Sequence, residues 1–178
     1  MRIIAGDRKG HTIYAPKGRD TRPTSDRVRE NVFNIVAPWV EGARVLDLYA
    51  GSGAMGLEAL SRGAAGVVFV EADADAVRTI ERNLDKLRLS GATVIRTEAM
   101  TGLAQEATAG RKYDLVLVDP PYSMTDFDTL ARYLPRVLAD DGLAVLESAA
   151  RTEPELAGLA VRTTRKYGST RVTVFEHQ

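Results

Sequence analysis

A repeated alternation of short apolar runs, glycine turns and amphipathic stretches is the feature that most constrains how this chain folds. The alternation begins after Ala43 and continues for about a hundred residues. Short strands that alternate with helices are typical of a parallel sheet covered by helices on both faces. We therefore predict an α/β fold with strands at 44–49, 67–71, 93–97, 113–119 and 143–147, and helices at 54–62, 74–89, 101–107 and 127–138.

The N-terminal region departs from this alternation. Residues 2–5 and 11–15 are β-like runs on either side of a glycine-rich turn, so they predict a small hairpin. A helix at 25–36 follows, with its apolar residues on one face and Thr24 or Ser25 as its cap. The hairpin and helix are too small for a separate domain, and we interpret them as an appendage on the main fold.

The C-terminal region predicts a different kind of pairing. Residues 159–164 and 169–175 flank a glycine-containing turn, which favours an antiparallel hairpin at the edge of the sheet. The complete fold is then a Rossmann-like, mostly parallel sheet of seven strands with helices on both faces. We expect one domain over 1–178, with the appendage at 1–40 and the core at 43–178.

Composition excludes several kinds of site. The chain has no cysteine, which excludes disulfides, cysteine–zinc sites and thiol catalysis. Its two histidines, His11 and His177, lie near the ends, so we expect no metal centre. No apolar run approaches the ~20 residues that span a membrane, and the start lacks the apolar stretch of a signal peptide. We expect a cytoplasmic protein, and a monomer because no exposed apolar patch is evident.

The charge of the chain is unevenly distributed. The net charge is zero, but residues 1–29 hold eight Lys and Arg against three Asp, a balance of +5 that leaves −5 for the remainder. A basic arm on an otherwise acidic domain is typical of a surface that contacts phosphates. The alternative is an ordinary solvated face.

The first predicted strand runs into a glycine turn that is typical of a nucleotide-like cofactor site. Gly51 and Gly53 allow a sharp turn and a close ligand, and the helix that follows offers free N–H groups. Glu71, at the end of the second strand, is placed to accept both hydroxyl groups of a ribose, unless it is only a solvated strand end. The spacing also fits a nicotinamide enzyme. The negative charge of Asp47, just before the glycines, favours a cofactor with a positively charged methionine end over a dinucleotide with a pyrophosphate. The alternative is that Asp47 only caps the glycine turn.

The fourth predicted strand ends abruptly in Asp119-Pro120-Pro121-Tyr122. The prolines stiffen this corner and hold a carboxylate, two carbonyl groups and a ring close together at the edge where α/β sheets bind ligands. This set suits methylation of a planar exocyclic amine, because the carboxylate and a carbonyl accept its two N–H bonds. The ring stacks the base, at ~1–3 kcal/mol. The alternative is a rigid, solvent-exposed turn.

Together these motifs resemble those of S-adenosylmethionine-dependent amino-methyltransferases. The segments that carry the resemblance, in family order, are 47–53, Glu71, 119–122 and 167–171. The N-terminal segments 1–6 and 21–30 are similar to those of the RsmD type, bacterial enzymes that methylate a guanine N2 amine in 16S rRNA. The resemblance covers nearly the whole chain.

The resemblance implies S-adenosyl-L-methionine as cofactor and 16S rRNA, in a partly assembled small ribosomal subunit, as partner. The implied catalytic residues are Asp119, Pro120, Pro121 and Tyr122. The implied cofactor-binding residues are Asp47, Tyr49, Gly51, Gly53, Glu71, Ala72, Glu98, Ala99 and Asp119. The implied RNA-binding residues are Arg8, Lys9, Arg19, Arg22, Thr24, Ser25 and Arg27.

Three other functions stay open. A DNA adenine-N6 methyltransferase shares the Asp-Pro-Pro-Tyr corner, but such enzymes usually need an added domain to read sequence. A nicotinamide oxidoreductase fits the glycine spacing but has no evident use for the corner. A non-catalytic RNA-binding module fits the basic arm, and the intact corner argues against it.

Overall fold

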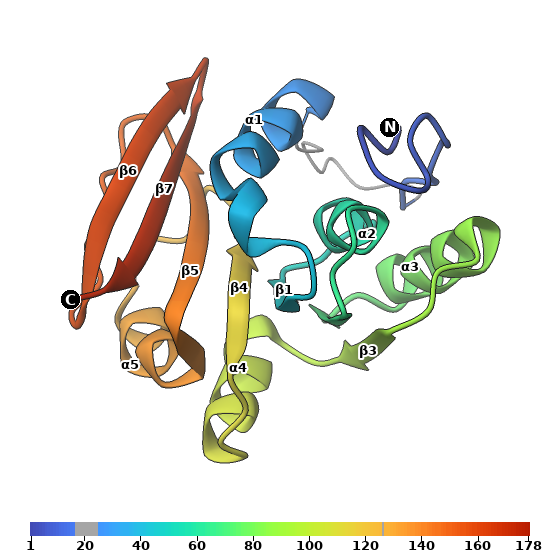
Figure 1. The fold of residues 1–178 in the computed structure, drawn as a ribbon. Helices are drawn as coiled ribbons and strands as arrows, with labels where there is room; N and C mark the ends of the chain where they lie inside the picture. Colours follow the sequence, from blue (N-terminus) through green and yellow to red (C-terminus); the bar gives the residue numbers. More distant parts are fainter. Residues whose placement is uncertain (17–24, 126) are drawn as a thin grey trace.

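The chain folds into a seven-stranded sheet with helices on both of its faces (Figure 1). This computed structural model describes residues 1–16, 25–125 and 127–178. Within those residues no helix has the length and apolar character that a membrane span requires. The elements in chain order are α1 (Asp26–Val36), the short 3₁₀ helix η1 (Ala37–Trp39), β1 (Arg44–Leu48), α2 (Ala54–Ser61), β2 (Gly66–Glu71), α3 (Ala74–Leu87), β3 (Ala92–Arg96), α4 (Ala99–Thr108), β4 (Tyr113–Val118), α5 (Asp128–Val137), β5 (Leu138–Ala149), β6 (Leu159–Tyr167) and β7 (Thr170–His177).

The strand order is β3-β2-β1-β4-β5-β7-β6. Strands β1 to β5 pair in parallel, and β7 lies antiparallel between β5 and β6. This confirms the predicted Rossmann-like, mostly parallel sheet with a C-terminal antiparallel hairpin. The chain order reverses between β1 and β4, and open α/β sheets bind ligands at such a switch point.

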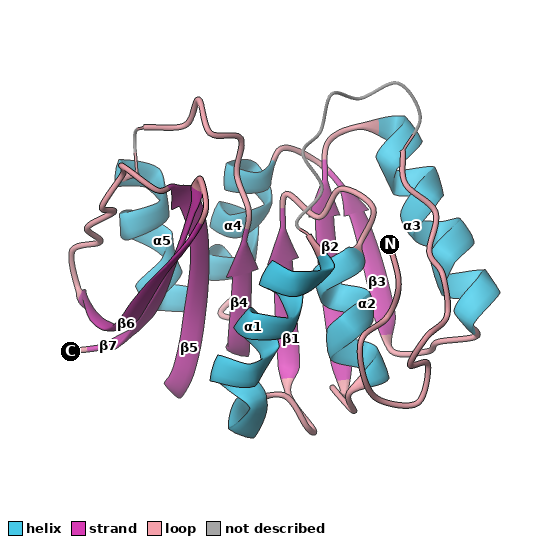
Figure 2. Ribbon diagram, turned by 90° about the horizontal axis from the view of Figure 1, so that it is seen from above, coloured by secondary structure: helices cyan, strands magenta, loops and turns pink. Residues whose placement is uncertain are grey.

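Alternating residues of the central strands face two separate hydrophobic layers. Val45 and Leu117 contribute to one cluster, which includes side chains of α1, α2 and α3. Leu46 and Val116 contribute to the other, which includes side chains of α4 and α5. Figure 2 shows α1, α2 and α3 on one side of the sheet, with α4 and α5 on the other. Burial on both faces explains why the strands are near-continuous apolar runs.

The N-terminal segment forms the predicted small hairpin and is also anchored to α2. Its two runs meet in an antiparallel bridge between Arg2 and Thr12, where Ile3 N donates to His11 O at 2.9 Å and Ile13 N donates to Met1 O at 3.0 Å. The backbone N–H groups of Ile4 and Ala5 donate to the carboxylate of Glu58, at 2.8 and 3.0 Å. A side chain from a distant helix therefore satisfies N–H groups that the hairpin does not use.

A buried ion pair joins α1 to the same carboxylate. The Arg29 and Glu58 side chains are both fully buried, and Arg29 Nε lies 3.4 Å from Glu58 Oε1. Arg62 reaches the other oxygen of Glu58 at 2.9 Å. Ile3 and Phe33 join the hydrophobic cluster on this face. The segment and α1 therefore pack into the core as well as against α2, whereas the division at 1–40 and 43–178 stays a prediction.

Some predicted boundaries differ from the observed ones. Helix α4 begins two residues earlier than predicted, at Ala99. Strand β5 begins at Leu138, because that residue pairs with Tyr113 ahead of an irregularity in the ladder. Strand β6 continues through the expected loop to Tyr167. The chain then turns at Gly168, whose φ of +59° suits glycine.

Candidate functional site

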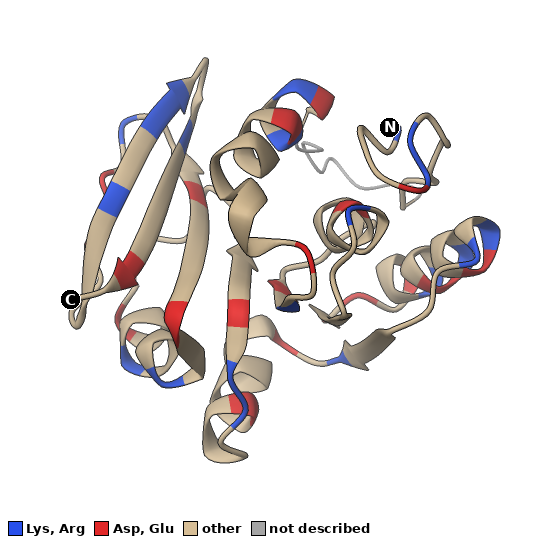
Figure 3. Cartoon of the chain, viewed as in Figure 1, with Lys and Arg blue, Asp and Glu red and all other residues tan. Residues whose placement is uncertain are grey.

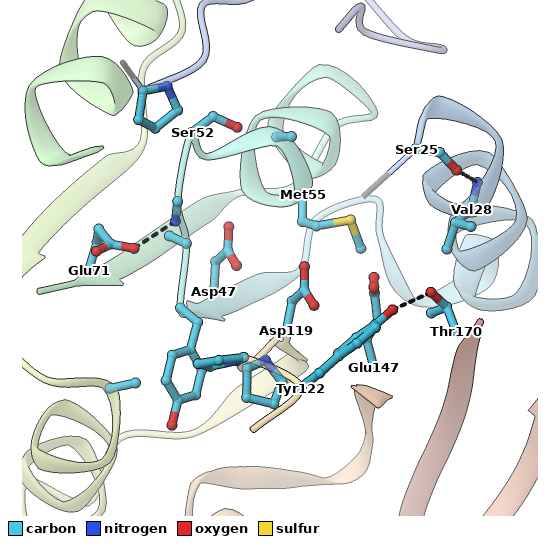
Figure 4. Close-up of a pocket in the computed structure, with 18 of the residues that line it drawn as sticks. Ser25, Val28, Asp47, Ser52, Met55, Glu71, Asp119, Tyr122, Glu147 and Thr170 are labelled. Atoms are coloured by element: carbon cyan, nitrogen blue, oxygen red, sulfur yellow. Dashed lines mark hydrogen bonds between the residues drawn. The ribbon is translucent and has the colours of Figure 1, made fainter. Parts of the chain in front are cut away.

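A cavity of about 850 Å³ opens where the carboxyl ends of the parallel strands meet. The segments that line it include the glycine turn after β1, the Asp119–Tyr122 corner after β4, and the turn between β6 and β7, which are distant in sequence. Figure 4 shows the polar side chains from these segments pointing into the same space. The fold thus brings together the two motifs that the sequence indicated separately.

The glycine turn is built from left-handed backbone. Tyr49, Gly51 and Gly53 have φ values of 57°, 57° and 83°, and Gly53 is the N-cap of α2. For the glycines this conformation is ordinary, but for Tyr49 it costs on the order of 1–3 kcal/mol. Backbone strain of this kind gathers at ligand sites. Tyr49 lines the cavity at the end of the strand.

Glu71 holds the glycine turn from the neighbouring strand. Its Oε1 accepts the backbone N–H of Gly51 at 2.9 Å, and its Oε2 accepts that of Asp73 at 2.7 Å. Its carboxylate is mostly buried and lines the cavity. Each carboxylate oxygen carries a further lone pair. These bonds therefore fix the carboxylate beside the glycine turn, in the wall of the cavity.

Asp47 lies at the base of the cavity. Its side chain is buried, and its Oδ2 accepts the backbone N–H of Gly56 at 3.0 Å. Burial raises the pKa of Asp47 well above its usual range, with smaller contributions from Asp119 and Glu71, and the Gly56 bond opposes the rise. The residue therefore caps the first turn of α2, directly after the glycine turn. A cation beside it would favour its charged form.

The Asp119–Tyr122 corner forms the opposite wall. Pro120 and Pro121 both line the cavity, as the sequence predicts for a stiff loop. The Tyr122 side chain is 39% exposed, and its hydroxyl forms a hydrogen bond with the hydroxyl of Thr170 at the start of β7. The ring is thus held by the corner at one end and by the β6–β7 turn at the other.

The remaining predicted cofactor residues form the wall beside α4. Ala72, Glu98 and Ala99 line the cavity, with Glu98 exposed at the N-cap position of α4. The Tyr49 hydroxyl donates to the sulfur of Met124 at 3.4 Å. Burial, and secondly the charge of Glu98, raise the pKa of Tyr49. This wall places an acceptor and a strand-end ring at one end of the cavity.

The predicted RNA-binding residues are dispersed. Ser25 lines the cavity and caps α1, whose exposed Arg27 follows directly. Arg8 is half-buried and donates to backbone carbonyl groups at the end of α3, away from the cavity, and its neighbour Lys9 is exposed. Outside the described residues lie Arg19, Arg22 and Thr24.

Sequence reasoning missed Glu147 and Thr170, which also line the cavity. Glu147 ends the apolar run of β5, just as Glu71 and Asp119 end apolar runs. By sheet register these three acids lie at one level, and Asp47 lies two residues deeper on β1. The signal that would have identified Glu147 was present, since an acid ends the apolar run of the predicted fifth strand, 143–147.

Comparison with known proteins gives consistent matches over the whole chain. The family model described as "Conserved hypothetical protein 95" matches residues 1–176. The Escherichia coli K12 protein "Ribosomal RNA small subunit methyltransferase D" is 41% identical over 150 residues, which cover 83% of this chain and 74% of that protein. The Bacillus subtilis protein "Putative rRNA methyltransferase YlbH" is 38% identical over 99% of this chain and 98% of its own length.

The fold agrees with that of a solved relative. The structure of "Putative methyltransferase yhhF from Escherichia coli" has a TM-score of 0.86 and 35% sequence identity with this chain. The match covers 100% of this chain and 98% of that one.

Proposed function

We infer the function from one premise: the chain belongs to the family described as conserved hypothetical protein 95, together with the ribosomal RNA small subunit methyltransferase D proteins. We propose that it is an S-adenosyl-L-methionine-dependent methyltransferase that acts on the N2 amine of a guanine in 16S rRNA. The curated relatives support methylation of ribosomal RNA. The choice of the guanine amine rests on the site described above and on the resemblance found in the sequence.

One observation carries the proposal. The glycine turn and the Asp119–Tyr122 corner face the same cavity, and its volume of about 850 Å³ leaves room for a cofactor and a base. Had the two motifs opened into different clefts, one site could not have held a methyl donor and an amine together.

The chain offers a suitable set of groups for the cofactor. S-adenosylmethionine supplies an electrophilic methyl group on a positively charged sulfur. The backbone of Gly51 and Gly53 would lie against its methionine end, and Glu71 would accept from its ribose hydroxyls. Asp47 would face the positive charge, while Glu98 and Ala99 would contact the adenine. The described residues fit this ligand because their acids match its charge.

The corner would hold the target amine. The carboxylate of Asp119 and the carbonyl group of Pro120 accept hydrogen bonds from its two N–H groups. This arrangement directs the nitrogen lone pair toward the glycine turn. Tyr122 stacks against the base, which must leave its own stack to enter the cavity. Catalysis then comes from orientation and from fixed dipoles aimed at the amine.

Basic residues near the cavity mouth would bind the RNA backbone. Figure 3 shows positive charge at the start of α1, which carries Arg27, and at the end of β6, which carries Arg165 and Lys166. Both ends adjoin residues that line the cavity, Ser25 and Tyr167. We propose that the enzyme reads RNA shape in a partly assembled small subunit.

The test is single-turnover transfer of a labelled methyl group to small-subunit particles purified from cells that lack this enzyme. Asp119→Ala should lower the rate by about 100-fold or more, the usual cost of removing a group that orients the reacting centre. Asp140→Ala, at an exposed position of β5, is the matched control and should keep the wild-type rate.

The position of the label decides the target. Mass mapping should find the added methyl group on the N2 amine of one guanine. Label on adenine, or a full rate with Asp119→Ala, would contradict the proposal. The rise in melting temperature that S-adenosylhomocysteine causes in each variant shows whether the cofactor site still binds. A variant that binds it but transfers no methyl group has lost catalysis and not cofactor binding.

A further inference from the structure

Glu147 is an acid of the cavity for which the proposed chemistry has given no use. It ends the apolar run of β5, and its side chain is buried, at 4% exposure for the residue. It lines the main cavity and also a small adjoining pocket that Asp47 and Asp119 share. An acid buried in the wall of a ligand cavity is a candidate for contact with the ligand.

The sheet register places Glu147 beside Asp119. Val118 of β4 pairs with Leu146 of β5, so the next residue of each strand continues the pair. Neighbouring strands lie ~4.8 Å apart, and alternate residues share a face. Asp119 and Glu147 are therefore adjacent acids on the face that carries Leu117 and Val145. Figure 4 shows both carboxylates directed into the cavity.

The two acids differ in their distance from the cofactor end. Asp47, on β1, is held by the backbone of the glycine turn's helix, and Asp119, on β4, comes next across the sheet. Glu147 lies one strand further, and it pairs with Val172 of β7, the strand whose Thr170 holds Tyr122. Glu147 is thus on the far side of Asp119 from the glycine turn, beside the ring proposed to stack the base.

We propose, on the basis of the function proposed above, that Glu147 accepts the N1–H of the target guanine and so selects guanine over adenine. Guanine presents two kinds of donor side by side, the N2 amine and the N1–H. Adenine presents an acceptor at N1 beside its amine. A row of two carboxylates complements the first edge and repels the second, because a carboxylate only accepts hydrogen bonds.

Asp119 and Glu147 would then have different roles. Asp119 orients the amine that is methylated, whereas Glu147 identifies the base that carries it. A buried acceptor left opposite another acceptor loses its bond and its solvation together, which makes such sites selective.

The test compares two RNA substrates whose target bases differ at N1 and, because 2-aminopurine lacks the carbonyl oxygen, at C6. After the target nucleotide has been mapped, one RNA carries guanine there and the other carries 2-aminopurine, which keeps the 2-amine but has an acceptor at N1. The wild-type enzyme should prefer guanine strongly in kcat/KM. Glu147→Gln and Glu147→Ala should each reduce that preference by about 10- to 150-fold, the worth of one hydrogen bond to a charged group.

The Gln variant should also gain rate on 2-aminopurine, because its amide can donate to N1. Glu155→Gln, at an exposed position of the same chain, should leave the preference unchanged. S-adenosylhomocysteine should still raise the melting temperature of every variant, which reports an intact fold and cofactor site.

The outcomes are distinct. An unchanged preference for guanine in both Glu147 variants would overturn this inference, as would an equal loss of rate on both substrates, which would indicate a purely structural role. Absence of transfer to either RNA by the wild-type enzyme would overturn the proposed function and this inference with it.

Discussion

Replacing Gly6 with alanine should destabilise the protein far more than the same change at Gly10. Both glycines have φ of +83°, in the left-handed region. A Cβ atom added to Gly6 would lie 1.9 Å from the carbonyl oxygen of Ser61, whereas one added to Gly10 would meet nothing within 4 Å. Gly10→Ala therefore measures the cost of backbone strain alone, whereas Gly6→Ala measures that cost together with the steric clash against α2.

The difference can be estimated from the contacts that Gly6 permits. Left-handed strain costs about 1–2 kcal/mol at either position. At Gly6 the segment must also withdraw from Ser61, which accepts from Asp7 N at 2.9 Å and from Arg8 N at 3.0 Å and donates to the Ala5 carbonyl at 2.7 Å. Loss of these bonds adds about 2–4 kcal/mol, at roughly 0.5–1.5 kcal/mol each.

Urea unfolding of the two variants, followed by circular dichroism, measures both free energies of unfolding. We expect Gly10→Ala to lose about 1–2 kcal/mol and Gly6→Ala about 3–6 kcal/mol relative to wild type. Equal losses would refute the reasoning, because they would mean that the N-terminal segment moves away from Ser61 at no cost.

Two further predictions concern the cavity itself. The pKa of Asp47 is raised in the folded state, mainly by burial, so its ionisation costs stability as pH rises from about 4 through that raised pKa. In cofactor-free protein, Asp47→Asn should therefore raise the melting temperature at pH 7 relative to wild type, with the advantage gone near pH 4; an advantage that is the same at every pH would contradict this. Tyr122→Phe keeps the ring but loses the bond to Thr170, and it should retain most of kcat/KM. Tyr122→Ala should lose about 5- to 150-fold by removing the stacking ring, and equal rates for the two variants would exclude stacking.

The core of the fold was predictable because its signals are local. Apolar runs, glycine turns and the capping serine Ser25 each determine structure within a few residues, and the predicted parallel sheet follows from their alternation. The glycine turn and the Asp119–Tyr122 corner were identifiable for the same reason. Their convergence on one cavity follows from strand order, because parallel strands end at the same edge.

The features that sequence reasoning missed depend on distant partners. The two N-terminal runs pair as predicted, but they are also anchored by Glu58 of α2, which accepts the N–H groups of Ile4 and Ala5. Nothing in the alternation of those runs signals a carboxylate from so far along the chain. The bond between Tyr122 and Thr170 is equally non-local. Glu147 differs, because it ends an apolar run as Asp119 does. The sequence alone could therefore have identified it as a candidate site residue.

The charge of the cavity determines which ligands and which part of an RNA it accepts. Among the residues that the structure describes, five carboxylates line it: Asp47, Glu71, Glu98, Asp119 and Glu147. Such a group favours a cation and opposes a phosphate. A methyl donor with a positive sulfur matches this field better than its demethylated product does, which assists product release. The same field opposes the pyrophosphate of a nicotinamide dinucleotide. In the function proposed here, the RNA phosphates stay on the basic residues at the cavity mouth while a base enters, and Asp119 and Glu147 favour a base with several donors on its edge.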